Sequence, residues 1–376
     1  MLKSELIPAD QTEETIRISK PELERKCRYD IDKENGFRDR KRLNLKLSDS
    51  LFRLGEEERA SRCKACGTPI WYEAVIRDGI VSRGKFKAGW FCEDRLCALC
   101  SWNKYRKMRK NLSDIVDYLY DDTEEYSFIL LTLTVSGRIT TDNLNSEYDK
   151  LEKSWTAFRK TKEFNSFSLG FFKATEITIN YQYADKSIII FHPHIHAIVA
   201  VKKDSYRTQT DCDSLQKTLT SVWSRVTGKY INPDKGVNIK PVAPDTEDYK
   251  ELMKQTLETA VYVGKGDIND KDCKEYAEIF SQRERIIDIT VYTLSSVLRN
   301  RHAMAMGGVF QKAKQALKIE RMDDCKDVEA LAGTTPEDET AEINSLNNVI
   351  KHAIVQFNWN NSMGGNYVVT NVELID

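Results

Sequence analysis

Three of the five histidines in this chain, His192, His194 and His196, fall within five consecutive residues. A β-strand places alternate side chains on the same face, so His194 and His196 can offer two imidazoles to one metal ion. Residues 198–201 are apolar and mostly β-branched, which favours a strand. Core packing does not explain such a cluster of imidazoles. The run therefore predicts a metal site carried by a strand.

A third ligand is expected on a neighbouring strand, because two imidazoles rarely hold a catalytic divalent ion without a carboxylate. Glu176 lies in the strand-like run 171–179, a short connection away from the histidine strand, predicted over 187–201. Strands joined so closely are expected to pair antiparallel. A glutamate among apolar neighbours is costly unless it binds something. The alternative is an outward-facing glutamate on a half-exposed strand.

The pattern of the middle of the chain predicts the fold class. Residues 128–135 are almost continuously apolar or β-branched, which is typical of a buried central strand. Helices are expected over 146–160, 213–226 and 248–263, and a further short strand over 237–242. Strands that alternate with helices around such a sheet indicate an α+β protein with a central antiparallel sheet flanked by helices.

We expect four regions along the 376 residues. They are a highly charged N-terminal arm (1–51), a cysteine-rich, basic module (52–125), the histidine-bearing domain (126–312) and an acidic linker with a C-terminal β-hairpin (313–376). The hairpin is predicted from two strand-like runs, 353–359 and 367–374, which are separated by Asn-Asn-Ser-Met-Gly-Gly.

Charge is unevenly distributed although the formal net charge is only −1. Residues 62–110 contain twelve lysines and arginines against four acidic residues, which favours contact with nucleic acid. The first residues have no signal-peptide pattern, and no uncharged apolar run approaches membrane-spanning length, so no membrane partner is expected. Nine cysteines, five of them in metal-ligand spacing, indicate a reducing, cytoplasmic environment.

The cysteine spacing predicts a zinc site. Cys63-Lys-Ala-Cys66 and Cys97-Ala-Leu-Cys100 form two Cys-x-x-Cys motifs, and Cys92 lies just before the second. Four thiolates in a tetrahedral arrangement make a closed structural Zn²⁺ site that stabilises a small domain. Spacing alone favours Cys63, Cys66, Cys97 and Cys100. A redox role is disfavoured, because neither motif opens a thioredoxin-like strand–helix unit.

A basic stripe mixed with aromatic residues follows the second Cys-x-x-Cys motif. Its charged members are Lys104, Arg106, Lys107, Arg109 and Lys110. On a helix these side chains suit contact with DNA phosphates. A solvated helix without a ligand has the same pattern, so both interpretations stay open.

A candidate nucleophile lies further along the chain. Glu258, Tyr262 and Lys265 have spacings of four and three, which place their side chains on one face of a helix. A nearby cation can activate a tyrosine phenol, whose pKa in water is about 10. A neighbouring carboxylate could activate a water for a second transfer, and Lys265 could pair with a phosphate or with the phenolate. Many surface helices share this spacing, so it indicates a nucleophile only in combination with the histidine metal motif.

Taken together, these motifs resemble those of the plasmid rolling-circle replication initiators of the HUH endonuclease superfamily, in the family with one catalytic tyrosine. Residues 130–134 (Leu-Leu-Thr-Leu-Thr) resemble the first motif, 192–196 the metal motif and 258–265 the Glu-x-x-x-Tyr-x-x-Lys motif. Residues 299–310 resemble the Arg-rich helix and Gly-Gly end of the family. Val261 is a departure, because a lysine often precedes the tyrosine in relatives.

The resemblance implies a site- and strand-specific DNA nickase. His194, His196 and Glu176 would hold catalytic Mn²⁺ or Mg²⁺. Tyr262 would form a 5′-phosphotyrosine intermediate, and Glu258 would later activate water to end the cycle. His192 would lie behind the ligands or close to DNA. Relatives also carry a cysteine at the place of Cys92, so the fourth zinc ligand is either Cys63 or Cys92.

The resemblance also implies partners. Double-stranded origin DNA and single-stranded DNA would be bound, and a host helicase, a polymerase and a single-strand-binding protein would act on the nicked plasmid.

Three alternatives to this function remain open. One is an HUH-type transposase or relaxase with the same chemistry. Another is a zinc-stabilised DNA-binding regulator without nicking activity. The third is a zinc hydrolase that uses the triad and a bound water and leaves Tyr262 without a role.

Overall fold

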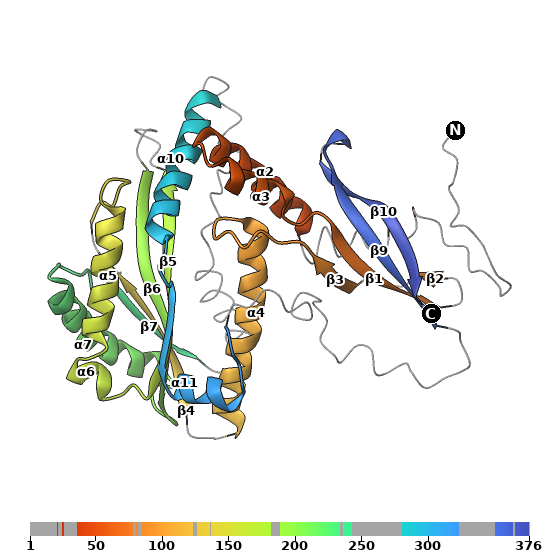
Figure 1. Cartoon of the computed structure of the whole chain (residues 1–376). Coiled ribbons are helices and arrows are strands. Elements are labelled where there is room, and N and C mark those ends of the chain that lie inside the picture. Colours follow the sequence, from red (N-terminus) through yellow and green to blue (C-terminus); the bar gives the residue numbers. More distant parts are fainter. Residues whose placement is uncertain are drawn as a thin grey trace, which may run out of the picture. The chain divides into compact units, whose positions relative to one another are not determined.

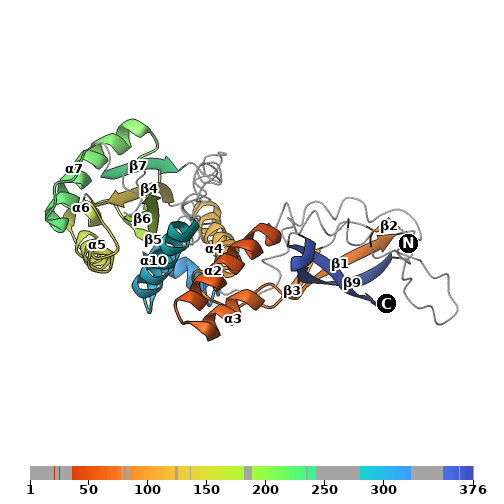
Figure 2. The ribbon, with the colours of Figure 1, turned by 90° about the horizontal axis from the view of Figure 1, so that it is seen from above.

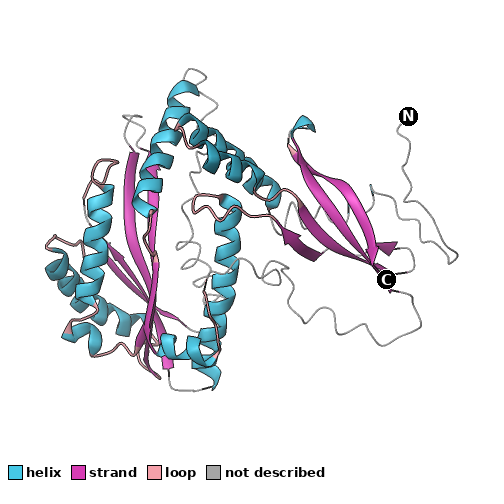
Figure 3. Cartoon of the chain, in the orientation of Figure 1, coloured by secondary structure: helices cyan, strands magenta, loops and turns pink. Residues whose placement is uncertain are grey.

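The computed structural model describes residues 36–77, 80–81, 85–122, 126–135, 137–181, 189–233, 236–242, 280–322, 350–363 and 365–375, besides Pro21 and Arg25. The chain forms two compact units, Met1–Asn103 together with Cys325–Asp376, and Lys104–Asp324. Each unit contains one antiparallel sheet with helices beside it (Figures 1 and 3). The predicted α+β class is therefore confirmed. None of the described helices is long and apolar enough to cross a membrane.

The second unit is built on a five-stranded sheet with the order β7-β4-β6-β5-β8, in which every neighbouring pair is antiparallel. Its strands are β4 (Tyr126–Thr134), β5 (Gly170–Tyr181), β6 (Ile189–Lys202), β7 (Val237–Val242) and β8 (Met304–Gly308). The predicted strands at 128–135, 171–179, 187–201 and 237–242 correspond to β4, β5, β6 and β7.

Helices surround this sheet. They are α4 (Ala98–Asp117), which begins in the first unit, η2 (Tyr118–Asp122), α5 (Leu144–Phe158), α6 (Lys162–Asn165), α7 (Gln209–Thr227), α10 (Phe280–Leu298) and α11 (Val309–Ala316). The predicted helices at 146–160 and 213–226 correspond to α5 and α7. The predicted helix at 248–263 lies outside the described residues. A capping box at Thr208 and Asp211 fixes the start of α7.

The two faces of this sheet differ in what covers them. On one face, Leu131 and Val199 pack with Trp155 of α5 and Trp223 of α7, and Figure 2 shows α5, α6 and α7 on that side. On the other face, an apolar half that includes Phe172 packs against α4 and α11. The rest of this second face carries polar side chains, among them Glu176, His194 and His196. This polar part of the face is where a binding site can lie.

The first unit combines segments from both ends of the sequence. Its elements are α2 (Phe37–Arg53), α3 (Glu57–Ala65), β1 (Ile70–Arg77), β2 (Ile80–Val81), β3 (Lys85–Gly89), β9 (Ile350–Asn360), η6 (Asn361–Met363) and β10 (Asn366–Ile375). The strand order is β10-β9-β1-β2, and β3 also pairs with β1. The predicted C-terminal hairpin is confirmed as β9 and β10.

The boundaries of the two units differ from the predicted regions. Part of the expected charged arm forms α2, which packs beside α3 in the cysteine-bearing unit. Strand β9 pairs with the whole of β1, from Ile70 opposite Phe357 to Arg77 opposite Ile350. The C-terminal hairpin therefore completes the sheet of the cysteine-bearing unit.

The expectation of an Arg-rich helix at 299–310 is wrong. Helix α10 ends at Leu298, and the segment forms a turn, β8 and the first residues of α11. Gly308 has φ +62° and ψ −135°, and a Cβ there would collide with the carbonyl oxygen of Leu169. Only glycine fits where the backbones of β8 and β5 approach so closely.

This close approach gives a test with a matched control. Replacement of Gly228 by alanine should cost about 1–2 kcal/mol, because its φ of +65° is unfavourable but the space around it is open. Gly308→Ala should cost more than Gly228→Ala, because strain and a backbone clash add. Urea unfolding of both variants measures the difference. Equal losses would show that the backbone of β8 is not held as closely as described.

Candidate metal centres

The register of β5 and β6 brings together the three residues predicted to hold a catalytic metal ion. Glu176 on β5 lies directly opposite His194 on β6, and His196 follows on the same face. Glu176 Oε2 is 2.8 Å from His194 Nε2 and 3.4 Å from His196 Nε2. One ligand atom from each residue lies within 4.8 Å of the other two. The geometry is that of a group able to hold one metal ion.

The donors of this triad fit a divalent cation. The three side chains are 12–17% exposed, so they are largely shielded from solvent but remain accessible to an ion. Among the described residues, Nε2 of His196 is buried and has no hydrogen-bond partner, as expected for a nitrogen that faces an ion. Burial raises the pKa of Glu176, but the hydrogen bond from His194 and the positive charge that His194 and His196 can carry outweigh it and hold the pKa below its usual value. The carboxylate is thus ready as an anionic ligand.

Two neighbours of the triad matter for its geometry. Nδ1 of His196 is 3.1 Å from the hydroxyl of Thr132 on β4, a residue that the sequence alone did not single out. His192 is exposed on the same strand, and the Thr178 hydroxyl donates to its carbonyl oxygen. Burial and the charge of His194 lower the pKa of His192. His192 is not part of the group that could hold the ion.

A second candidate centre is formed by thiols in the first unit. Cys66, Cys92, Cys97 and Cys100 are buried, and their sulfurs all lie within 4.8 Å of one another. The fifth thiol, Cys63, is also buried, and its sulfur lies 3.9 Å from that of Cys92. Hydrogen bonds from Cys100 and Cys63 lower the pKa of the Cys92 thiol. Between the two candidates for the fourth ligand, the structure brings Cys92 into the compact set and leaves Cys63 beside it.

Helix α2 supplies the surroundings of this cluster. The amide of Asn44 donates to the sulfur of Cys97 at 2.9 Å, and its oxygen accepts from the backbone N–H of Ala98 at 2.8 Å. The ammonium group of Lys41 donates to the carbonyl oxygens of Lys64 and Cys66, both at 2.6 Å. Asn44 and Lys41 are 0% and 1% exposed. The buried ammonium group and the amide donor would thus stabilise negative charge on the sulfurs.

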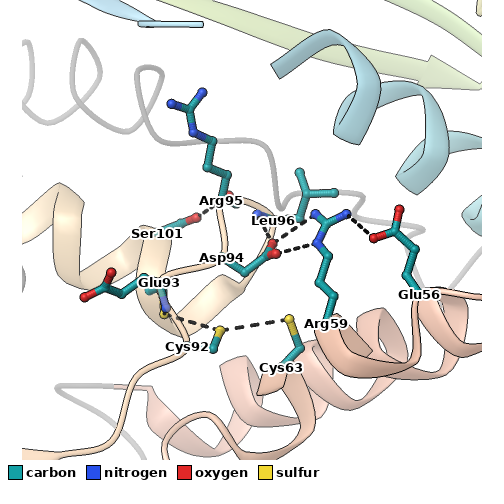
Figure 4. A network of polar contacts seen from close by, with 10 residues as sticks. Glu56, Arg59, Cys63, Cys92, Glu93, Asp94, Arg95, Leu96 and Ser101 are labelled. Carbon is teal, nitrogen blue, oxygen red and sulfur yellow. Dashed lines mark hydrogen bonds and ion pairs between the residues drawn. The ribbon is translucent and has the colours of Figure 1, made fainter. Parts of the chain in front are cut away.

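An ion pair joins the two segments that carry the cysteines (Figure 4). Arg59 of α3 donates to both carboxylate oxygens of Asp94, at 2.5 and 3.2 Å, and Asp94 also accepts from the backbone N–H of Leu96. Cys63 lies one turn beyond Arg59, and Cys92 lies two residues before Asp94. This two-point contact fixes the loop between Cys92 and Cys97 against α3.

Other predicted site residues are only partly located. Glu258, Tyr262 and Lys265 lie outside the described residues. The basic stripe is on α4, where Arg109 and Lys110 are exposed. The other three members, Lys104, Arg106 and Lys107, are half-buried. Burial raises the pKa of Asp114, and the neighbouring charges of Lys110 and Lys107 oppose this shift. Part of the stripe therefore faces an acidic group of its own helix.

Fold and sites together define an α+β protein with a carboxylate–bis-imidazole triad on an antiparallel sheet and a separate cluster of thiols. Comparison with known proteins identifies the family. The profile of the Rep_1 family, described as "Replication protein", matches residues 83–366. The chain belongs to this family of replication proteins, in agreement with the family predicted from its motifs.

Curated relatives support the same assignment. The chain is 26% identical to "Protein rep" of Lentilactobacillus hilgardii over 292 residues, which cover 77% of this chain and 85% of the relative. It is also 26% identical to "Protein rep" of Streptococcus pneumoniae, with 77% and 82% covered. "Protein rep" of Staphylococcus aureus is 27% identical, with 63% and 94% covered. No solved structure matches the chain significantly.

The role of Asn44 can be tested by truncation. Asn44→Ala removes the donor to Cys97 and leaves the N–H of Ala98 without this acceptor, so unfolding free energy should fall by about 1–3 kcal/mol. Asn358→Ala is the control, because its amide donates to the exposed hydroxyl of Thr370 and its loss should cost less than about 0.5 kcal/mol. Urea denaturation of the full chain compares them. Similar losses would mean that α2 does not support the thiol cluster.

Proposed function

We propose that this protein initiates rolling-circle replication of a plasmid by nicking one strand of its origin through Tyr262. The observation that carries the proposal is the triad of Glu176, His194 and His196 across β5 and β6. The family assignment supports a role in replication. The resemblance to single-tyrosine HUH endonucleases supplies the nucleophile.

The triad would hold Mn²⁺ or Mg²⁺. Two imidazoles and one carboxylate suit Mn²⁺ better than an all-oxygen site would, and such an ion polarises a phosphodiester when it is bound. The residues themselves contribute a preformed geometry, because both histidines and the glutamate are fixed by strands in register. A site built on strands holds ligands more rigidly than one built on a loop.

The proposed reaction is a transesterification that needs no external energy. The phenolic oxygen of Tyr262 gives up its proton and attacks the scissile phosphorus. The bond from phosphorus to the 3′ oxygen breaks, and the leaving 3′ oxygen keeps the electron pair and takes up a proton from solvent. The products are a 5′-phosphotyrosine and a free 3′-hydroxyl, from which a host polymerase extends. Lys265 would pair with the phosphate or the phenolate. Glu258 would accept a proton from water when the regenerated site is cleaved at the end of the cycle.

DNA contacts are proposed for the basic stripe of α4, with Arg109 and Lys110 as its exposed members. Origin DNA would be bound as duplex and as single strand, and the host helicase and single-strand-binding protein would follow the nick. This activity supports a cytoplasmic location, as does the absence of disulfides among the described cysteines.

We further propose that Cys66, Cys92, Cys97 and Cys100 hold a structural Zn²⁺. Four buried sulfurs within bonding range of one ion are the donor set of a closed zinc site. Two donors to Cys97, from Asn44 and from the backbone N–H of Cys100, match the outer contacts that orient metal-bound thiolates. Such a metal contributes to folding of its unit.

The nucleophile is tested by Tyr262→Phe. The nicking rate on supercoiled plasmid carrying the origin should fall by about 10³-fold or more, and no covalent adduct should form, because the attacking oxygen is gone. Mass spectrometry of the peptide that contains Tyr262, after incubation with single-stranded origin oligonucleotide and Mn²⁺, detects the adduct. Tyr230→Phe is the control, since this tyrosine is 76% exposed in the second unit. Intact nicking by Tyr262→Phe contradicts the proposal, and origin binding without nicking by the unmodified chain favours a DNA-binding regulator.

The zinc ligands are tested by paired serine variants. Cys92→Ser should lose its bound zinc and unfold at lower temperature, whereas Cys63→Ser should keep one zinc ion per chain. Elemental mass spectrometry measures metal content, and Cys212→Ser, at a buried thiol on α7, controls for loss of any cysteine. The opposite pattern would establish the ligand set that spacing alone favours.

A further inference from the structure

The first family motif lies on β4, and the proposed function gives its polar residues no role. Leu131 and Leu133 are buried in the core against α5 and α7. Thr132 and Thr134 point to the other face of the sheet, where register places Thr132 opposite His196 and Thr134 opposite His194. The alternation of residues 130–134 therefore puts one hydroxyl beside each ligand histidine.

The two hydroxyls have different partners. Thr134 Oγ1 donates to the carbonyl oxygen of Gly236 at 3.0 Å. Thr132 Oγ1 lies 3.1 Å from Nδ1 of His196. The other ring nitrogen of His196, Nε2, faces Glu176 and has no hydrogen-bond partner among the described residues. Thr132 therefore contacts one ring nitrogen of His196, and Glu176 lies beside the other.

A neutral imidazole carries its proton on only one of its nitrogens. If Nδ1 carries the proton, Nε2 keeps a lone pair for a cation. If Nε2 carries it, that nitrogen cannot act as a ligand until the proton leaves. The direction of the hydrogen bond at Nδ1 therefore decides whether Nε2 of His196 is ready to bind metal.

We propose that Thr132 is a positioning residue: its hydroxyl oxygen accepts a hydrogen bond from Nδ1–H of His196 and so keeps Nε2 available to the divalent cation. This inference rests on the proposed metal triad and assigns a task to the first motif. Strands β4 and β6 are paired neighbours, so the same contact also fixes the plane of the imidazole ring.

Metal affinity provides the first test. Thr132→Val keeps the shape of the side chain but removes its oxygen, and the Mn²⁺ dissociation constant should rise by about 10- to 100-fold. Thr132→Ser restores the acceptor and should restore the affinity. Thr134→Val is the matched control on the same strand and should bind as the unmodified chain does. Titration of the full chain, followed by the electron paramagnetic resonance signal of free Mn²⁺, gives all four constants.

The outcomes separate positioning from general stability. Thermal unfolding of the variants shows whether the sheet has loosened, and an equal loss of affinity in Thr134→Val would overturn the proposal. Unchanged affinity in Thr132→Val would also overturn it. No Mn²⁺ binding by the unmodified chain would overturn both this proposal and the metal triad.

The tautomer provides the second test. Nuclear magnetic resonance of chain labelled with ¹⁵N-histidine and loaded with Mg²⁺ should show the proton of His196 on Nδ1, with the signal assigned by its absence in His196→Gln. A proton on Nε2 overturns the proposal. Neither readout uses DNA, so a chain that binds Mn²⁺ as expected but does not nick counts against the proposed function and not against Thr132.

Discussion

The candidate catalytic site depends on the register of β5 against β6, in which Glu176 lies opposite His194. A slip of one residue would turn Glu176 to the opposite face. That face is already committed, because Lys173 donates to both carboxylate oxygens of Glu152, at 2.6 and 2.8 Å, and the Thr175 hydroxyl donates to the same carboxylate. A slipped strand would bring Glu176 towards Glu152 and remove the buried lysine that neutralises it. The ion pair between Lys173 and Glu152 on one face of β5 therefore favours the register that keeps Glu176 beside the histidines on the other face.

The thiol cluster depends on charge in a similar way. Burial lowers the pKa of Lys41 to about 8, whereas the negative charges of Cys66, Cys97 and Cys92 oppose this shift. The more negative the sulfurs, the better the buried ammonium group is stabilised. Metal-bound thiolates would supply that charge permanently, since the ion keeps them deprotonated. Lys41 and a metal-bound cluster would thus stabilise each other, which would account for a lysine with 1% exposure in a core.

The sheet of the second unit could be predicted closely from the sequence, because its strands are long apolar runs and its histidines alternate with apolar residues. The first unit was harder to predict. The buried face of α2 includes Lys41, Asn44 and Ser48, so the sequence of this helix is as polar as that of a solvated arm. Inside the fold, however, each of these three polar side chains has a hydrogen-bond partner. Spacing also could not decide between Cys63 and Cys92, because the choice depends on how a loop folds back. The contact of Thr132 with His196 could not be predicted from the sequence, because the two residues lie on different strands and are 64 residues apart.

The topology of the first unit bears on when its thiol cluster is completed. The family match begins at residue 83, so Cys66 and α2 precede it, while Cys92, Cys97 and Cys100 lie within it. These three alone cannot close a tetrahedral site. Strand β1, which follows Cys66, pairs with β9, and β9 is separated from it by the whole second unit. Because synthesis proceeds from the N-terminus, the second unit can fold first, and the first unit gains its central strand pair only when β9 emerges. The unit that carries the thiol cluster therefore completes its own sheet only after the second unit has been synthesised.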